Sequence, residues 1–145
     1  MATIVLAADH AGHPLKETVK QYVQLEGHDV IDVKPALDPA DDYPAIMREG
    51  ARQVLQKNAI GIFFGGSGNG EAMAANRFPG IRAALCTSPE LAIAARGHND
   101  ANVLCLGARF IDAGTALSIV DAFLETPFDG GRHERRIKDL DAPIA

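Results

Sequence analysis

This chain contains no tryptophan, only two cysteines and no long hydrophobic run. Cys86 and Cys105 lie in separate apolar segments without CxxC spacing, which predicts two buried, reduced thiols and neither a disulfide framework nor a metal–thiolate site. No apolar run approaches the roughly 20 residues of a membrane span, and the N-terminus lacks the basic region and apolar core of a signal peptide. We therefore expect a cytoplasmic protein with no membrane partner.

Positive charge is scarce as well. The 14 Lys and Arg residues are outnumbered by 19 Asp and Glu residues, which gives a formal net charge of −5. Binding to nucleic acid needs a basic field, so the composition argues against nucleic acid as the main partner. The 145 residues suit one domain, and no linker or low-complexity segment interrupts them. We predict a single domain over residues 1–145.

Short apolar runs alternate with helical patterns along the chain. Strands are expected at residues 3–8, 30–33, 60–64, 81–86 and 102–106. Helices are expected at residues 14–26, 43–57, 71–77, 89–97, 112–125 and 131–140. Strands that are apolar on both faces and separated by helices form a parallel sheet covered on each side. The predicted fold class is α/β: a three-layer α/β/α, Rossmann-like domain with a five-stranded parallel sheet.

The most informative segment is the glycine-rich sequence at residues 65–71, between an expected strand and an expected helix. Such a turn aims backbone N–H groups at one point, which suits an anion or a developing oxyanion. The dinucleotide-binding fingerprint fails here because its third glycine would fall on Glu71 or Met73, and a P-loop fails because Glu71 stands where Lys is required. A carboxylate would repel a phosphate, so we interpret Glu71 as a base. The alternative is a tight turn that needs glycine only for its backbone.

Other polar residues follow the expected strands at the edge where ligands bind in such sheets. Asp9 and His10 follow the first strand, and Arg109 follows the fifth. His98 instead precedes the fifth strand, so topology places it at the opposite end of the sheet. Only a neighbouring subunit or a curved approach would bring it to the same site.

Each of these signals also has a structural alternative. Residues 9–10 would serve as a helix cap with an exposed imidazole, and Arg109 as a surface charge or a partner for a C-terminal carboxylate. Residues 98–100 match a turn that ends a helix, where Asn and Asp are common. A further feature is a helix start crowded with positive charge at residues 132–136, which a bound phosphate would relieve.

Eight spaced motifs occur here in the order found in one enzyme family. They are Asp9-His10-x-Gly12, Asp42-Tyr43-Pro44, Gly66-Ser67-Gly68-x-Gly70, Ala74-Ala75-Asn76, Gly80-Ile81-Arg82-Ala83, His98-Asn99-Asp100-x-Asn102, Gly107-x-Arg109 and Gly130-Gly131-Arg132-His133-x-x-Arg136. In these motifs the chain closely resembles ribose-5-phosphate isomerase type B, a family that also contains galactose-6-phosphate and allose-6-phosphate isomerases. The resemblance runs from the first strand to about Leu140.

The resemblance implies isomerisation of a phosphosugar through a cis-enediolate, without a metal or other cofactor. It also implies a homodimer, or a dimer of such dimers, whose sites lie between subunits, with the helix at about 131–140 contributing to the partner's site. Many members carry a cysteine base at the position of Gly65, which this chain lacks. It resembles instead the subgroup in which a Glu at the position of Glu71 takes the proton.

The catalytic roles that the resemblance implies fall on four residues. Glu71 is the base, and Ser67 with the backbone N–H groups of residues 68–70 holds the developing oxyanion. His98, with Asp9 as the alternative, opens the sugar ring.

The remaining implied residues surround the substrate. They are His10, Tyr43, Gly66, Gly68, Asn69, Gly70, Asn99, Arg109, Arg132, His133 and Arg136. Tyr43 and Asn99 would contact sugar hydroxyls or the ring oxygen, while His10 and the three arginines would hold the phosphate, which the planar guanidinium suits. The expected substrate pair is ribose 5-phosphate and ribulose 5-phosphate. The alternatives are a six-carbon phosphosugar and a non-catalytic phosphosugar-binding domain.

Overall fold

The centre of the molecule is a parallel sheet of five strands, in the order β2-β1-β3-β5-β4. The computed structural model describes residues 2–144. The strands are β1 (Thr3–Ala8), β2 (Asp29–Asp32), β3 (Ile60–Gly65), β4 (Ala83–Leu85) and β5 (Val103–Gly107). The three central strands are almost fully buried because their side chains are apolar on both faces.

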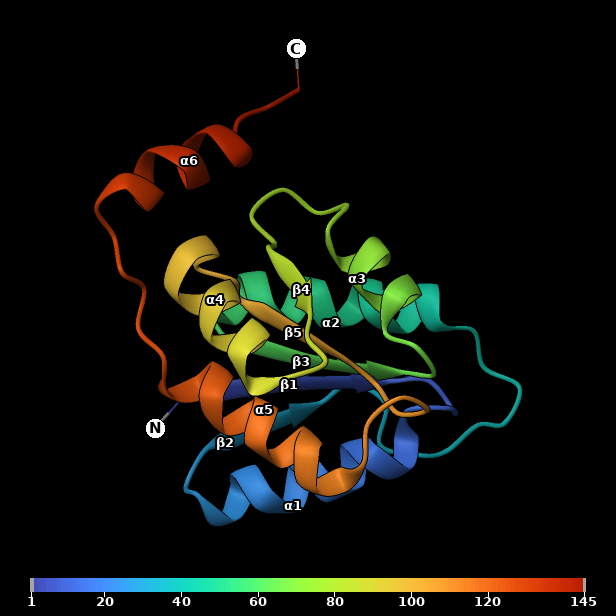
Figure 1. Ribbon diagram of the computed structural model, residues 1–145. Helices are drawn as coiled ribbons and strands as arrows, with labels where there is room; N and C mark the ends of the chain where they lie inside the picture. Colours follow the sequence, from blue (N-terminus) through green and yellow to red (C-terminus); the bar gives the residue numbers. More distant parts are fainter. Residues whose placement is uncertain (1, 145) are drawn as a thin grey trace.

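Helices cover both faces of the sheet and complete three layers (Figure 1). They are α1 (His13–Leu25), α2 (Tyr43–Lys57), α3 (Asn69–Ala75), α4 (Pro89–Asn99), α5 (Ala113–Glu125) and α6 (Arg132–Leu140). The buried faces of α1, α4 and α5 share one apolar core, and those of α2 and α3 share the other. The predicted α/β/α fold is therefore confirmed. Within residues 2–144, no helix has both the length and the apolar character needed to cross a membrane.

The predicted elements lie within two residues of the observed limits, and the fourth strand and the helix after the glycine-rich turn differ most. The fourth strand, expected over residues 81–86, is confined to Ala83–Leu85. The Ile81 N–H donates to the Phe78 carbonyl and the Arg82 N–H to the Asn102 side chain, so the regular ladder begins after Arg82, although its carbonyl accepts from the Asn102 and Val103 N–H groups. Helix α3 begins at Asn69, two residues earlier than predicted, because Gly68 provides the left-handed N-cap with φ of 85°. Glu71 thus lies inside the first turn of α3.

Helix α6 is set apart from the three layers (Figure 1). It packs mainly on α4, and His133 is its one buried residue among those that the structure describes. Nearly all of its remaining surface is exposed. A helix in this position adds little to the core of its own chain.

Candidate active site

The glycine-rich turn joins β3 to α3 at the carboxyl edge of the sheet. Gly68 combines a positive φ with close packing, because an added Cβ would lie 2.5 Å from the Leu85 side chain. The Ser67 hydroxyl accepts a hydrogen bond of 3.2 Å from the Asn69 N–H, which tightens the turn. At Gly68, glycine is therefore required by the backbone conformation and packing of the turn. This agrees in part with the alternative that the turn needs glycine only for its backbone.

Gly65 has a different role, because it makes room for the side chain of Glu71. A Cβ at Gly65 would overlap the Glu71 carboxylate, so the carboxylate occupies space that any other residue at position 65 would fill. Glu71 is only 4% exposed. The position of the Glu71 carboxylate thus depends on the absence of a side chain at Gly65.

Burial is the main cause that raises the pKa of Glu71 above its ordinary value. The nearby Asp9 carboxylate adds to the increase, and backbone N–H groups of Glu71 and Gly68 oppose it. Asp9 is itself buried, and its Oδ1 accepts a hydrogen bond of 3.1 Å from the Gly12 N–H. Asp9 therefore supports the turn before α1 and also acts electrostatically on Glu71.

The thiol nearest to this carboxylate is not reactive. Cys105 and Cys86 are both buried and free, as the sequence predicts. Burial raises the pKa of Cys105 well above its ordinary value, and the charges of Glu71 and Cys86 act in the same direction. The Cys105 sulfur therefore stays protonated at neutral pH and does not act as a base.

Two side chains cover the backbone of the turn. The Tyr43 ring lies over Gly70, where an added Cβ would come within 2.5 Å of it. The Arg109 guanidinium lies over Gly66, where an added Cβ would be 2.7 Å from Nη1. We call Asp9, His10, Tyr43, residues 65–71 and Arg109 together the loop cluster. The predicted site residues in this set come from four separate segments of the chain, and the structure brings them together.

His10 lies at the rim of the loop cluster and is paired with Asp41. One oxygen of Asp41 accepts a hydrogen bond of 3.0 Å from the His10 N–H and lies 2.9 Å from the imidazole Nδ1. The hydrogen bond to Asp41 is the largest cause that raises the pKa of His10. Sequence reasoning missed Asp41, because the motif found there begins at Asp42 and the contact of Asp41 with His10 spans 31 residues of the chain.

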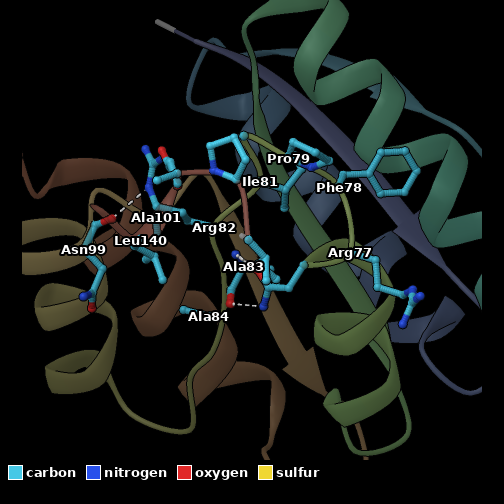
Figure 2. A pocket seen from close by; sticks show the side chains of 16 residues that line it. Arg77, Phe78, Pro79, Ile81, Arg82, Ala83, Ala84, Asn99, Ala101 and Leu140 are labelled. Atoms are coloured by element: carbon cyan, nitrogen blue, oxygen red, sulfur yellow. Dashed lines mark hydrogen bonds and ion pairs between the residues drawn. The ribbon is translucent and has the colours of Figure 1, made fainter. Parts of the chain in front are cut away.

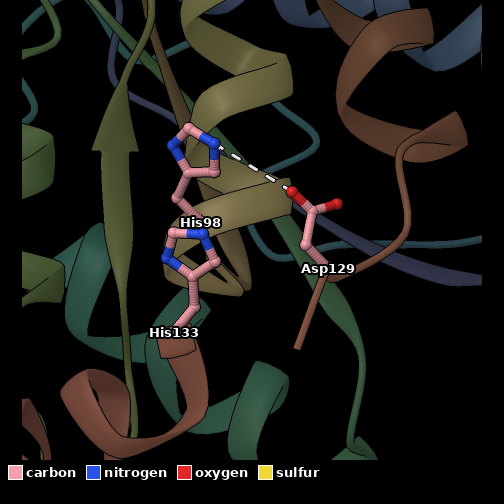
Figure 3. Close-up of side chains that lie close together, drawn as sticks. All are labelled: His98, Asp129 and His133. Atoms are coloured by element: carbon pink, nitrogen blue, oxygen red, sulfur yellow. Dashed lines mark ion pairs between the residues drawn. The ribbon is translucent and has the colours of Figure 1, made fainter. Parts of the chain in front are cut away.

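A second group of polar residues forms where α6 packs on α4 (Figure 3). The rings of His98 and His133 stack with centroids 4.7 Å apart and planes inclined by 13°. The Asp129 carboxylate lies 4.0 Å from His98 Nε2 and against Gly97, whose carbonyl accepts a hydrogen bond from the Asp129 N–H. Burial lowers the pKa of His133, and the charges of Arg132, His98 and Arg136 lower it further.

His98, Asp129 and His133 also form a group whose ligand atoms lie within 4.8 Å of one another. The sequence predicts no metal site, and it gives no hint of this group because Asp129 and His98 are far apart in the chain. Imidazole lone pairs lie in the ring plane, so two nearly parallel stacked rings do not point at one ion. The arrangement is not a preformed metal site.

These residues stand apart from the loop cluster. We call His98, Asn99, Asp129, Arg132, His133 and Arg136 the α6 cluster. It lies at the amino end of β5, whereas Arg109 and the glycine-rich turn lie at the carboxyl end (Figure 1). The prediction that His98 is at the opposite end of the sheet is confirmed. The turn predicted at residues 98–100 is also present, since Asp100 is left-handed with φ of 46°.

Two hollows open on the surface of the molecule. One, of about 310 Å³, adjoins the loop cluster at Tyr43 and Gly70. A larger one, of about 610 Å³, lies between β4 and the C-terminal segment, with Arg82 and Asn99 toward one rim and Phe78 toward the other (Figure 2). The larger hollow is not lined by Glu71 or Asp9, the carboxylates of the loop cluster. Its larger volume therefore does not make it the catalytic site.

Comparisons with known proteins agree with this geometry. The family model described as Ribose/Galactose Isomerase matches residues 4–140. The chain is 44% identical over 140 residues to ribose-5-phosphate isomerase B of Mycobacterium tuberculosis, covering 94% of this chain and 86% of that protein.

Solved structures give the same result. A ribose 5-phosphate isomerase from Thermotoga maritima matches with a TM-score of 0.93 and 48% identity, over 97% of each chain. Ribose-5-phosphate isomerase B from Mycoplasma genitalium with bound ribulose-5-phosphate matches with a TM-score of 0.92 and 39% identity, over 96% of this chain and 93% of that one. Together with the loop and α6 clusters, these matches show that the chain belongs to the ribose/galactose isomerase family.

Proposed function

We propose that this protein interconverts ribose 5-phosphate and ribulose 5-phosphate, with Glu71 as the base that moves the proton. The observation that carries this proposal is the buried Glu71 carboxylate in the space left by Gly65. One relative named ribose-5-phosphate isomerase B is 44% identical to the chain, and a solved ribose 5-phosphate isomerase matches it with a TM-score of 0.93. These names support the choice of substrate.

The proton moves between adjacent carbons of the open-chain sugar. Glu71 removes it from C2 of the aldose, the electrons pass to the C1 carbonyl oxygen, and a cis-enediolate forms. The O2 hydroxyl proton moves to O1, which places the negative charge on O2. Return of the carbon-bound proton from Glu71 to C1, with the C2–O bond becoming the carbonyl, then gives the ketose. The raised pKa of Glu71 suits a group that must both accept and release a proton near neutral pH.

Charge develops on oxygen during this step and needs donors nearby. We assign this role to the N–H groups of the turn and of the first turn of α3, and to the Ser67 hydroxyl, whose oxygen accepts from the Asn69 N–H and whose proton is left to donate. Gly66, Gly68, Asn69 and Gly70 thus bind substrate through their backbone, and Tyr43 contacts a sugar hydroxyl.

Ring opening needs a second acid–base group, since the sugar is mostly cyclic in water. Two candidates remain, Asp9 beside Glu71 and His98 in the α6 cluster. Asp9 is already bound to the Gly12 N–H, whereas His98 has an exposed ring. We favour His98 of a second copy, with Asn99 beside it on the ring oxygen.

The same partner copy would complete the phosphate site. His10 and Arg109 lie in the loop cluster, whereas Arg132 and Arg136 lie on the exposed surface of α6, with His133 between them. A second copy placed across the larger hollow would cover apolar side chains such as Leu140 and Ile144, which are 64% and 101% exposed. A homodimer with shared sites accounts for both the separated clusters and this exposed surface.

The test is turnover measured on a panel of five- and six-carbon aldose phosphates. We expect ketose formation from ribose 5-phosphate and much slower reaction of galactose 6-phosphate and allose 6-phosphate. Faster turnover of a six-carbon substrate would change the assignment within the family. Binding without turnover of any member of the panel would leave a phosphosugar-binding domain.

A further inference from the structure

We propose that Asp41 is a positioning residue for the phosphate site, acting through His10. This inference rests on the proposed function, because it gives His10 a phosphate to bind. The recognised chemistry is a phosphate monoester, and the role of Asp41 is to fix which ring nitrogen of His10 faces it.

The geometry of the pair is specific. A single Asp41 oxygen lies 3.0 Å from the His10 backbone nitrogen and 2.9 Å from its Nδ1. It therefore ties the imidazole to the backbone of its own residue and leaves Nε2 as the nitrogen that can donate to a ligand. The Asp41 side chain is 8% exposed and the His10 side chain 42% exposed. Asp41, which holds the imidazole, is therefore buried, whereas the His10 ring is accessible to a ligand.

The charge of the pair fits the same role. The hydrogen bond to Asp41 is the largest cause that raises the pKa of His10, and desolvation, the second largest, opposes it. The charges of Asp9 and Asp41 add to the increase, so the net effect favours the protonated form. A protonated imidazole offers the phosphate a charge-assisted hydrogen bond from Nε2. The arrangement resembles metal sites in which a carboxylate orients a ligating histidine, with a phosphate in place of the metal.

The adjacent residue provides a matched control. Asp42 is the N-cap residue of α2, is exposed, and makes no side-chain hydrogen bond at that cap. It carries the same charge as Asp41, next to it in the chain. Asp42→Asn therefore removes an equal charge without touching the imidazole.

The experiment measures kcat, KM for ribose 5-phosphate and competitive inhibition by inorganic phosphate across roughly pH 6 to 9, which spans the usual titration range of histidine. We expect Asp41→Asn to raise KM and the phosphate inhibition constant about 3- to 10-fold at neutral pH, with kcat changed by less than about twofold. The increase should be largest between the pKa of His10 in the variant and its higher pKa in the wild type, because only there is the imidazole neutral in one protein and protonated in the other. It should shrink above the wild-type pKa. Asp42→Asn should resemble the wild type.

A double-mutant cycle separates this role from a general structural one. If Asp41 acts through His10, Asp41→Asn has no further effect on KM in a His10→Gln background. An equal effect of Asp41→Asn in both backgrounds, or none in the wild type, would overturn the inference.

The NMR titration of His10 in the wild-type protein gives an independent reading that needs no variant. It should show a pKa above that of an ordinary histidine, and an ordinary or lowered value would also overturn the inference. Absence of isomerase activity would instead contradict the proposed function. In that case phosphate binding and the His10 titration would still test Asp41.

Discussion

The loop cluster and the α6 cluster each contain a carboxylate facing a glycine, and they hold it differently. In the loop cluster Glu71 is 4% exposed, and a Cβ at Gly65 would overlap its carboxylate. In the α6 cluster the Asp129 side chain is 57% exposed, and a Cβ at Gly97 would lie 3.2 Å from it. The first carboxylate is fixed by packing, and the second can move into solvent.

This difference indicates which of the two clusters a single chain holds in a fixed geometry. The sheet, the turn and α3 form the loop cluster from elements with a shared core, so its geometry depends on the fold itself. The α6 cluster depends on a helix that packs mainly on α4 and is otherwise exposed. In the proposed mechanism, proton transfer at Glu71 would thus be preorganised within the subunit, whereas the residues on α6 would need a partner to meet the substrate.

The largest expected effect comes from removing the base. Glu71→Gln keeps the size of the side chain but cannot accept a proton. We expect kcat to fall by about 10²- to 10⁴-fold while phosphosugar binding stays measurable. Steady-state kinetics and calorimetric binding of ribose 5-phosphate check this.

The matched control is Glu90→Gln, which changes an exposed glutamate in the first turn of α4. It should retain wild-type kinetics. If Glu71→Gln kept more than about a tenth of the wild-type kcat, another residue would have to be the base.

A pair of glycine substitutions tests the comparison between the two clusters. Gly65→Ala should displace the Glu71 carboxylate, lower kcat about 10- to 100-fold, and destabilise the protein by about 1–3 kcal/mol. Gly97→Ala should change stability by less than about 1 kcal/mol, because the Asp129 side chain can move and alanine favours the helix. Chemical denaturation of both variants gives the two free energies of unfolding. Equal losses at the two positions would remove the distinction between a fixed and a movable carboxylate.

A smaller effect concerns stability and pH. Because burial raises the pKa of Glu71 in the folded protein, the folded state keeps this proton to higher pH than the unfolded chain. The contribution of this proton to stability is fully present below the pKa that Glu71 has in the unfolded chain. It is lost as the pH rises through the higher pKa of Glu71 in the folded protein. Glu71→Gln has no such loss, so it should be more stable than the wild type at pH 7.5 and not at pH 4. Thermal unfolding at the two pH values measures this, at about 2–4 °C for each kcal/mol.

Much of this architecture could be predicted because its signals are local. Alternating apolar runs predicted the sheet, and the helix starts predicted at residues 14, 43 and 89 lie within one residue of the observed ones. The coupling between Gly65 and Glu71 could not be predicted, because it depends on where a side chain from α3 returns to the end of β3. The residues that were missed, Asp41 and Asp129, act through contacts with distant segments, which the motifs that begin one residue later, at Asp42 and Gly130, do not reveal.

The central claim is that a working site combines the loop cluster of one subunit with the α6 cluster of another. Complementation tests it most directly, by mixing inactive Glu71→Gln protein with inactive Arg136→Ala protein under conditions that exchange subunits. Each mixed dimer would contain one intact site and one that lacks both groups. With random exchange of equal amounts, activity should return to about a quarter of the wild-type value. No recovery, with subunit exchange demonstrated independently, would mean that each chain builds its site alone and would contradict the account.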